Sequence, residues 1–465
     1  MLTTALILLP VAAALAVAVL PLPRETAAGL ALLAALLEVG LWITALTRFD
    51  FDAGGLQLGT SREWVESLGI SYSVGLYGFS LWLVGATTVV FAAAIGYAAW
   101  VGRERARAYH ALMLLLLGAV VATFAAQDLL LFYIAFEAML IPLYVLVGVW
   151  GGARRQAATV TFVIYTMAGS LLMLAAIIVF GLSQGTFSLV ESGVSANEWV
   201  FLGFLAAFAV KAPIFPFHGW LVDAYRESPP EVAAILSGVV SKAAVYGLLR
   251  IVLEKFPEPV DDFQDAILAF AAIGLVFGSL LAFRAPDLRS VTAYSSMAQM
   301  GLIVLGLFSL TELGRSGAVL QSVAHGLVSA ALFLLAGMVE TRTGTSALAV
   351  LGGMARGRPS LATVLMTTGI IALAVPGSVA FAGEFLILAG VYDAGWGWAA
   401  VGAGAIVLAA MYMLRLISAV LHRAPGADVR DEARDLRPFE LALVVPLVGL
   451  LLLLSAWPAL ISERV

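Results

Sequence analysis

The chain uses lysine sparingly and places it inside apolar segments. Only three of its 25 Lys and Arg residues are lysines, and two of these lie where a membrane helix would exclude water. Lys211 follows the apolar run 199–210, and Lys242 lies inside the apolar run 232–247. An ionised lysine at the middle of a bilayer costs about 2.5–3.5 kcal/mol on insertion scales. Arginine keeps its proton in almost any surroundings, whereas a buried lysine can release it. These two lysines therefore predict proton movement.

Four more ionisable residues interrupt apolar segments: Glu137, His325 and Glu384, and His218 beside a proline-rich break. A structural explanation pairs Glu137 with Lys211 and makes His325 a hydrogen-bonded core histidine. Buried ion pairs, however, are often no more stabilising than apolar packing. A set of this size in one membrane domain is hard to explain by stability, and it favours a proton relay.

The composition is typical of a polytopic helical membrane protein, with 62% hydrophobic and 12% charged residues. The chain has no cysteine, which excludes disulfides and cysteine-ligated zinc or iron–sulfur sites within it. Its four histidines lie in separate segments and predict no metal or haem site. No basic stripe indicates nucleic acid. Residues 2–20 are apolar with no basic residue before Arg24, so we expect a retained first span rather than a signal peptide.

Apolar stretches of about 20 residues predict fourteen membrane spans. Their approximate limits are 2–20, 27–47, 72–99, 108–126, 128–150, 157–182, 198–218, 230–254, 263–284, 287–309, 315–340, 360–393, 397–421 and 437–460. The stretches 72–99 and 360–393 are longer than a perpendicular span needs, which indicates a tilt or a break. The expected fold is an all-α polytopic membrane protein.

Two of these spans carry helix-breaking residues beside an ionisable group. Pro213 and Pro216 follow Lys211 in the seventh span, and Pro376-Gly377 precedes Glu384 in the twelfth. Proline removes a helix hydrogen bond, so both helices should be discontinuous. Paired breaks predict two inverted five-helix repeats with the ion site at the breaks. The expected regions are an N-terminal three-helix region at 1–107, repeats at 108–262 and 263–421, and a loop with the last helix at 422–465.

The basic residues divide unevenly between the two sets of loops. Alternate loops carry 16 of the 25 Lys and Arg residues, the opposite loops carry five, and four lie within spans. Because basic loops stay in the cytoplasm, the 16-charge side is predicted to be cytoplasmic and both termini outside. The charged stretch Arg423–Arg437 is interpreted as a solvated cytoplasmic loop, with a subunit contact as the alternative.

Several motifs resemble one known family. They are the stretches Asp128–Tyr144, Lys211–Leu221, Ala293–Ser296, Ala324–Leu327 and Gly383–Phe385. Together they resemble the antiporter-like subunits of respiratory complex I, the bacterial NADH–quinone oxidoreductase, and most closely its M-type subunits. The Met139-Leu-Ile-Pro142 stretch and the glutamate at position 384 favour the M type, because the L and N types look to carry lysine at the latter place. The resemblance covers essentially the whole chain.

The resemblance implies a role for each ionisable residue. Glu137 and Lys211 match the family's interacting pair in the fifth and seventh spans, and Lys242 matches its central lysine in the eighth span. His325 matches the eleventh-span histidine and Glu384 the terminal carboxylate of the twelfth. The implied fold has fourteen helices with two inverted repeats. The implied activity is proton translocation by one subunit of a translocase, driven by redox chemistry elsewhere.

The resemblance also implies partners and a location. FMN, iron–sulfur clusters and quinone are expected in partner subunits, with no cofactor in this chain. The expected partners are sister subunits of the L and N types, the lipid bilayer and protons. The expected location is the inner membrane of the cell.

The chain departs from the family at two places. The family usually has a histidine in the tenth span where this chain has Gln299, which can order water but cannot titrate. Tyr225 and Ser228 replace the family's histidine and alanine in the loop after His218. Gln299 and His218 are expected to support the relay residues. These differences keep two alternatives open: a subunit of a multisubunit Na+ or cation/proton antiporter, or of a membrane-bound hydrogenase. A structural membrane scaffold that transports nothing is the third alternative.

Overall fold

The computed structural model of the chain describes residues 1–429 and 434–464. Its helices in the first half are α1 Leu2–Val19, α2 Arg24–Arg48, α3 Gly78–Val101, α4 Ala106–Ala125, α5 Leu129–Ala138, α6 Leu140–Trp150, α7 Arg155–Gln184, α8 Glu198–Lys211, α9 Leu221–Glu227, α10 Pro230–Ile235 and α11 Lys242–Gly247. Those in the second half are α12 Pro257–Arg284, α13 Leu288–Leu307, α14 Glu312–Thr343, α15 Pro359–Ala372, α16 Val379–Ala394, α17 Trp396–Ile417, α18 Pro438–Ala456 and α19 Ala459–Ser462. The short elements are the 3-10 helix η1 Glu66–Leu68, the π-helical turns η2 Leu236–Val240, η3 Leu248–Leu253 and η4 Ser418–His422, and the strands β1 Gln57–Val65 and β2 Ile70–Leu76.

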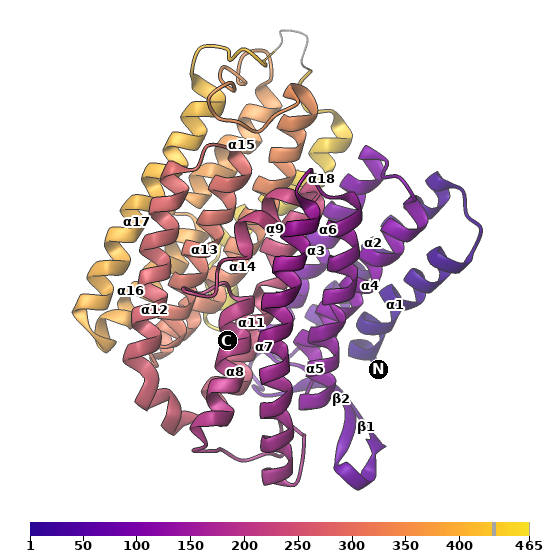
Figure 1. Cartoon of the computed structure of the whole chain (residues 1–465), viewed down its shortest axis with the longest axis vertical. Helices are drawn as coiled ribbons and strands as arrows, with labels where there is room; N and C mark the ends of the chain where they lie inside the picture. Colours follow the sequence, from indigo (N-terminus) through magenta and orange to yellow (C-terminus); the bar gives the residue numbers. More distant parts are fainter. Residues whose placement is uncertain (430–433, 465) are drawn as a thin grey trace. The chain divides into compact units, whose positions relative to one another are not determined.

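The chain forms two compact units. The first consists mainly of Met1–Ala212 and Val239–Asp265, and the second of Pro213–Gly238 and Ala266–Glu463. Within each unit the long helices run roughly side by side (Figure 1). These units reflect packing, and the predicted repeat boundaries at 108–262 and 263–421 stay a prediction.

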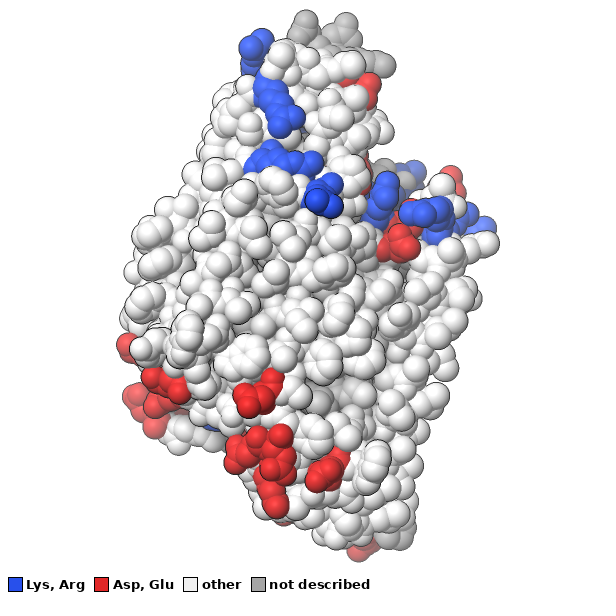
Figure 2. Space-filling model, turned by 60° about the vertical axis from the view of Figure 1, so that its left-hand side comes forward, with Lys and Arg blue, Asp and Glu red and all other residues white. Residues whose placement is uncertain are grey.

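Twelve helices of the described residues are long and apolar enough to cross a membrane. The two remaining predicted spans, 198–218 and 360–393, are the ones that were predicted to be interrupted. On the face that Figure 2 shows, Lys and Arg gather toward one end and Asp and Glu toward the other, with a broad uncharged surface between. Helix α12 has the same distribution of charge, because Glu258 lies in its first turn and Arg284 is its last residue. The chain is a multi-pass membrane protein, while the number fourteen and the positions of the termini stay predictions.

The predicted discontinuous helices are confirmed. Helix α8 ends at Lys211, two residues before Pro213, which has no N–H to donate to a preceding carbonyl. Helix α15 ends at Ala372, and the chain then turns at Gly377, whose φ of +95° is disfavoured for residues with a Cβ. The Ser378 hydroxyl accepts a hydrogen bond from the N–H of Phe381 and caps the start of α16.

A third break was not predicted. The expected span 128–150 is divided at Met139 into α5 and α6. Pro142 explains this break, because it removes the N–H that would bond to the carbonyl of Ala138 four residues earlier. Glu137 is therefore the second-to-last residue of α5 and lies beside an irregular stretch of backbone.

Part of the third predicted span is a strand rather than a helix. Residues 72–76 belong to β2, which pairs antiparallel with β1, so α3 begins only at Gly78. The alternating sequence Ile70-Ser-Tyr-Ser-Val74 has the period of two that suits a strand. Gly69 makes the turn with a φ of +63°. This hairpin lies at the ends of α4 and α5, as Figure 1 shows.

The two units contain matching backbone contacts. Asp128 caps α5 in the first unit, and Asp287 caps α13 in the second. In each unit the residues around the cap pair with the segment after a later helix. The hydrogen bonds join Leu129 to Phe187 at 2.8 Å and Leu189 to Gln127 at 2.8 Å in the first unit, and Leu288 to Ser346 at 2.9 Å and Leu348 to Pro286 at 3.0 Å in the second. The same arrangement, an aspartate cap beside two backbone hydrogen bonds, thus occurs once in each unit.

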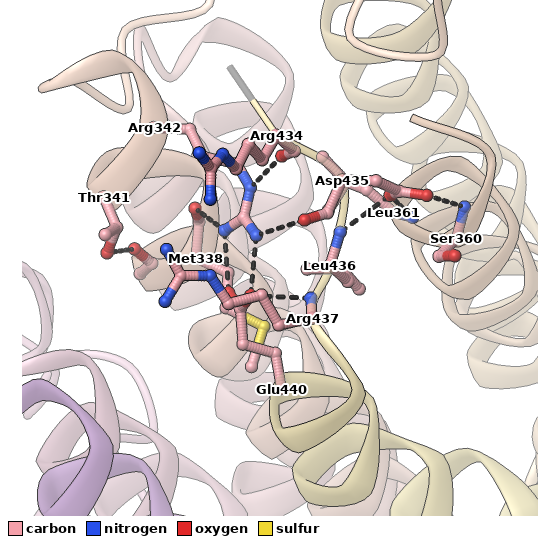
Figure 3. A network of polar contacts seen from close by, with 11 residues as sticks. Met338, Thr341, Arg342, Ser360, Leu361, Arg434, Asp435, Leu436, Arg437 and Glu440 are labelled. Carbon is pink, nitrogen blue, oxygen red and sulfur yellow. Dashed lines mark hydrogen bonds and ion pairs between the residues drawn. The ribbon is translucent and has the colours of Figure 1, made fainter. Parts of the chain in front are cut away.

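An arginine anchors three segments of the second unit. Arg342, near the end of α14, donates two hydrogen bonds to the carboxylate of Glu440 in α18, at 2.8 and 2.7 Å (Figure 3). It also donates to the carbonyls of Met338, Arg434 and Asp435 at 2.8, 2.7 and 3.0 Å. The side chain of Arg342 is 8% exposed and that of Glu440 is fully buried. This ordered anchor occupies the end of the predicted loop Arg423–Arg437, of which residues 430–433, including Arg430, lie outside the described residues.

Asp435 extends this anchor to α15. Its carboxylate accepts hydrogen bonds from the backbone N–H groups of Ser360, Leu361 and Leu436 at 2.9, 2.9 and 2.8 Å. Burial alone would raise the pKa of Asp435, but these backbone donors outweigh it and lower the pKa. The resulting stabilisation is complete above about pH 4 and is lost only as the pH falls through the lowered pKa.

We expect Arg342→Gln to destabilise the second unit by about 3–5 kcal/mol, because it leaves the buried Glu440 carboxylate without its cation. Hydrogen exchange of α18 in the purified protein measures the effect. The exposed Arg356→Gln is the matched control. The double variant Arg342→Met plus Glu440→Met should recover most of the loss, since no buried charge then lacks a partner. Unchanged exchange in the Arg342→Gln variant would contradict this account.

Candidate functional site

The first unit contains three of the predicted ionisable residues. Glu137 on α5 is half-buried, and Lys211 at the end of α8 is 3% exposed. The ammonium of Lys211 lies over the ring of Phe136, 4.8 Å from its centroid. In the part of the chain that the structure describes, no hydrogen-bonded ion pair joins Lys211 to Glu137, although the two are close enough to interact electrostatically. The carboxylate and the ammonium are therefore neighbours without a fixed contact.

Lys242 is the most deeply buried of the three, with 1% exposure. It begins α11, directly after Ser241 and the π-helical turn η2. Its Nζ donates to the hydroxyl of Ser241 at 3.2 Å. A π-helical turn is rare and is found frequently at functional sites. Glu137, Lys211 and Lys242 thus share one property: each lies at an irregularity in its helix.

The second unit places His325 in a chain of hydroxyl groups. His325 on α14 is 6% exposed, and its Nε2 lies 3.1 Å from the hydroxyl of Ser296 on α13. Ser237 on η2 donates to Ser296 at 2.9 Å and also hydrogen-bonds with Ser329 on α14. Hydroxyl groups both donate and accept hydrogen bonds, so this series of hydroxyl groups can pass a proton to or from the imidazole.

Glu384 belongs to a second chain of polar groups. On α16, it is 2% exposed and accepts a hydrogen bond from Nε2 of Gln299 at 2.9 Å. The side-chain oxygen of Gln299 in turn accepts from Nε2 of Gln321 on α14 at 2.8 Å. Within the described residues, the other carboxyl oxygen of Glu384 has no hydrogen-bond partner.

One cavity is lined by residues from both of these hydrogen-bonded series. Its volume is about 20 Å³, and its lining includes Gln299, Gln321, His325, Ser295 and Ser329. That volume is enough for a water molecule with several polar partners. The structure therefore places His325 and the supporting Gln299 in the lining of one small cavity, and Glu384 is joined to that lining by its hydrogen bond with Gln299.

His218 lies apart from this cavity. It is half-buried in the segment that follows α8 and precedes α9 in the sequence. The centroid of its ring lies 5.5 Å from those of Phe215 and Phe277. It lines a larger cavity of about 430 Å³ together with Asp223, Arg226 and other residues. The structure thus assigns His218 to different surroundings from those of His325.

Some polar residues of these sites were not singled out from the sequence. Ser237 and Gln321 are ordinary residues in apolar helices, and Ser296 was noted only as the end of the motif Ala293–Ser296. No spacing marks the three as partners of His325 or Glu384. Glu38 had a signal that was overlooked, because it is the one acidic residue within the apolar run 27–47. It is fully buried in α2, and neither carboxyl oxygen has a hydrogen-bond partner among the described residues.

We expect Gln299→Leu to destabilise the second unit. The leucine leaves Glu384 without its donor and Gln321 without its acceptor, at about 1–3 kcal/mol for each unsatisfied group. Gln299→His restores the donor and should retain most of the stability. Thermal unfolding of the purified protein measures the effect. A leucine variant as stable as the unaltered protein would refute the role of Gln299.

The chain is similar to known proteins over almost its whole length. A family model described as NADH:quinone oxidoreductase/Mrp antiporter, TM matches residues 126–409. The NADH-quinone oxidoreductase subunit M of Mycobacterium tuberculosis is 35% identical, over 97% of this chain and 90% of that protein. A chain of respiratory complex I from Thermus thermophilus superposes with a TM-score of 0.91 at 32% identity, covering 100% of this chain and 97% of its own length. A chain of the Mrp complex from Dietzia sp. DQ12-45-1b has a TM-score of 0.88 at 21% identity, over 100% and 96% of the two chains, a likeness of fold.

Proposed function

Because the chain belongs to the family of NADH:quinone oxidoreductase and Mrp antiporter membrane subunits, we propose that it is the M-type subunit of an NADH–quinone oxidoreductase and moves protons across the membrane. The observation that carries this proposal is a cluster of ionisable residues in each unit, all of them buried except the half-buried Glu137. The first consists of Glu137, Lys211 and Lys242, and the second of His325 and Glu384. Buried ionisable groups inside membrane helices are expensive and mark ion pathways.

In the first unit the lysines bind and release the proton. Among the described residues Lys211 forms no hydrogen-bonded ion pair, so a small movement of Glu137 changes the electrostatic support for its ammonium. When the carboxylate moves away, the buried ammonium loses its compensating charge and its proton passes on to Lys242. The helix irregularities beside all three residues allow such movements, because the backbone is not locked in a regular hydrogen-bond ladder there.

In the second unit the proton is held and released. Ser237 and Ser296 connect with His325, and Gln299 connects with Glu384. His325 and Gln299 both line the cavity of about 20 Å³. Gln299 cannot titrate, so it orders this path while His325 and Glu384 carry the charge. His218 has a supporting role at the break after α8.

Moving one proton against about 150 mV costs roughly 3.5 kcal/mol. The proposed source of this energy is redox chemistry in partner subunits. FMN, iron–sulfur clusters and quinone are proposed there, with subunits of the L and N types as neighbours in the inner membrane. The arginine-rich loops would face the cytoplasm and both termini the outside.

A cation/proton antiporter is the second candidate. The matching family model includes Mrp antiporters, and the fold likeness to the Mrp complex extends over the whole chain. The higher identity to NADH-quinone oxidoreductase subunits, 35% against 21%, favours the redox complex.

Purification of the native complex tests this choice. We expect flavin- and iron–sulfur-containing partner subunits to copurify, and the isolated chain to have no NADH or quinone oxidoreductase activity. Small antiporter subunits in place of redox subunits would instead establish the second candidate. Stoichiometric flavin, haem or iron–sulfur absorption in the isolated chain would also contradict the proposal.

A further inference from the structure

A row of polar side chains leads from Lys242 to the surface of the first unit. Tyr246, Arg250 and Glu254 follow Lys242 at intervals of four residues, through α11 and the π-helical turn η3. Residues four apart lie on one side of a helix. The exposed fraction is 1% at Lys242 and 0% at Tyr246, and it is 5% and 43% for the side chains of Arg250 and Glu254. Such a row would connect the central lysine with the membrane face at which η3 ends.

Arg250 occupies this row with a fixed, buried guanidinium. Its side chain is 5% exposed and forms an ion pair with Glu254. It also approaches the side-chain oxygen of Gln127 at 3.4 Å and the carbonyl of Leu189 at 3.5 Å, and it lies 4.5 Å from the centroid of the Tyr77 ring. Contacts on several sides hold the cation in place.

Tyr246 separates Arg250 from Lys242. Its hydroxyl donates to the carbonyl of Ala126 at 3.1 Å and accepts from Nε2 of Gln127 at 3.4 Å. Three aromatic rings surround its own ring at centroid distances of 5.7, 5.9 and 6.0 Å, those of Phe79, Phe124 and Phe132. Apolar rings and a tyrosine with two polar partners leave this stretch of the row closely packed.

A guanidinium in this position opposes the passage of cations. Arginine keeps its proton, so it cannot relay one. A fixed positive charge in a narrow pore excludes protons and other cations. Lys242 and Arg250 thus have opposite properties on one helix face, since the first can release a proton and the second cannot.

We propose that Arg250 is an electrostatic barrier that prevents protons and other cations from passing between Lys242 and the membrane face at Glu254. The inference rests on the proposed function, in which Lys242 carries a proton. The barrier keeps that proton from escaping at this end of the first unit, so that it leaves only by the coupled route. Arg250 is a positioning residue, because it acts on the path of the proton without binding it.

The test is the passive proton permeability of sealed vesicles that contain the assembled complex and no NADH. A potassium gradient with valinomycin sets the potential, and an internal pH-sensitive dye reports the flux. Arg250→Gln should raise the flux about tenfold or more, because it removes a full charge from a poorly screened site. Arg250→Lys keeps the charge and should stay close to the unaltered protein.

Arg62→Gln is the control. Arg62 is an exposed basic residue of β1 in the same unit, and it takes no part in the row. Its loss should leave the flux unchanged. A flux in Arg250→Gln equal to that of the unaltered protein would overturn the proposal. So would an Arg250→Lys variant as permeable as Arg250→Gln, because packing rather than charge would then close the path.

Arg250→His provides a test that does not require the neutral variant to assemble. Imidazole loses its charge near neutral pH. The flux, corrected for the proton gradient, should therefore be low at about pH 5.5 and increase toward about pH 8. A flux independent of pH would overturn the barrier. This assay measures passive proton flux without NADH oxidation, whereas the proton relay is tested by the number of protons moved per electron. A negative result for the barrier is therefore distinguishable from a negative result for the relay.

Discussion

Lys242→Arg should abolish proton transfer through this subunit almost as completely as Lys242→Ala. The arginine preserves the positive charge at a position that is 1% exposed, so a purely structural cation would be retained. It cannot release its proton under physiological conditions. A relay at Lys242 therefore stops in both variants, and we expect proton transfer through the subunit to fall by about a hundredfold or more.

Acidification of sealed vesicles at matched rates of NADH oxidation measures this effect. Arg250→Lys, on the same helix face, is a suitable comparison, because it exchanges the same two residue types in the opposite direction where no proton needs to move. Near-normal acidification with Lys242→Arg, together with loss in Lys242→Ala, would establish a structural charge instead of a relay.

The second large effect is expected from the double variant Glu137→Gln plus Lys211→Met. If the two residues formed a structural ion pair, removing both charges would be tolerated, because the buried site would avoid the cost of desolvation. The ammonium of Lys211 contacts the Phe136 ring rather than a carboxylate oxygen of Glu137, and Glu137 is only half-buried. We therefore expect the double variant to assemble normally and yet to lose coupled pumping.

Glu137→Gln alone should have the same phenotype. It is nearly isosteric, so assembly tests the packing while pumping tests the charge. A single variant that pumps normally would show that the field of Glu137 does not control Lys211.

The membrane spans could be predicted from the sequence because apolar length is a direct physical requirement of the bilayer. The interruptions at Pro213 and Pro376 were predictable for the same kind of reason, since proline cannot donate a hydrogen bond. The break at Met139 follows from Pro142 but was hidden within one continuous apolar run. The β1–β2 hairpin was missed because its second strand, Ile70–Leu76, is apolar enough to extend the following span.

The candidate site was predictable only for its ionisable members. Lys211, Lys242, His325 and Glu384 stand out because charge is costly in a membrane. Ser237 and Ser296 do not, since a hydroxyl group in a helix usually bonds to its own backbone. Their contact with His325 depends on tertiary packing between segments far apart in sequence. Gln299 was identified by its difference from the family pattern, and the structure adds that it connects Glu384 with Gln321.

The proton-to-electron ratio of the assembled complex tests the relay most directly. It is measured in sealed vesicles during NADH oxidation, for the unaltered complex and for the double variant Glu137→Gln plus Lys211→Met. The relay predicts normal assembly with a lower ratio, because the protons carried by this subunit are lost while electron transfer continues. An unchanged ratio in the double variant would contradict the relay and leave Glu137 and Lys211 as a structural pair.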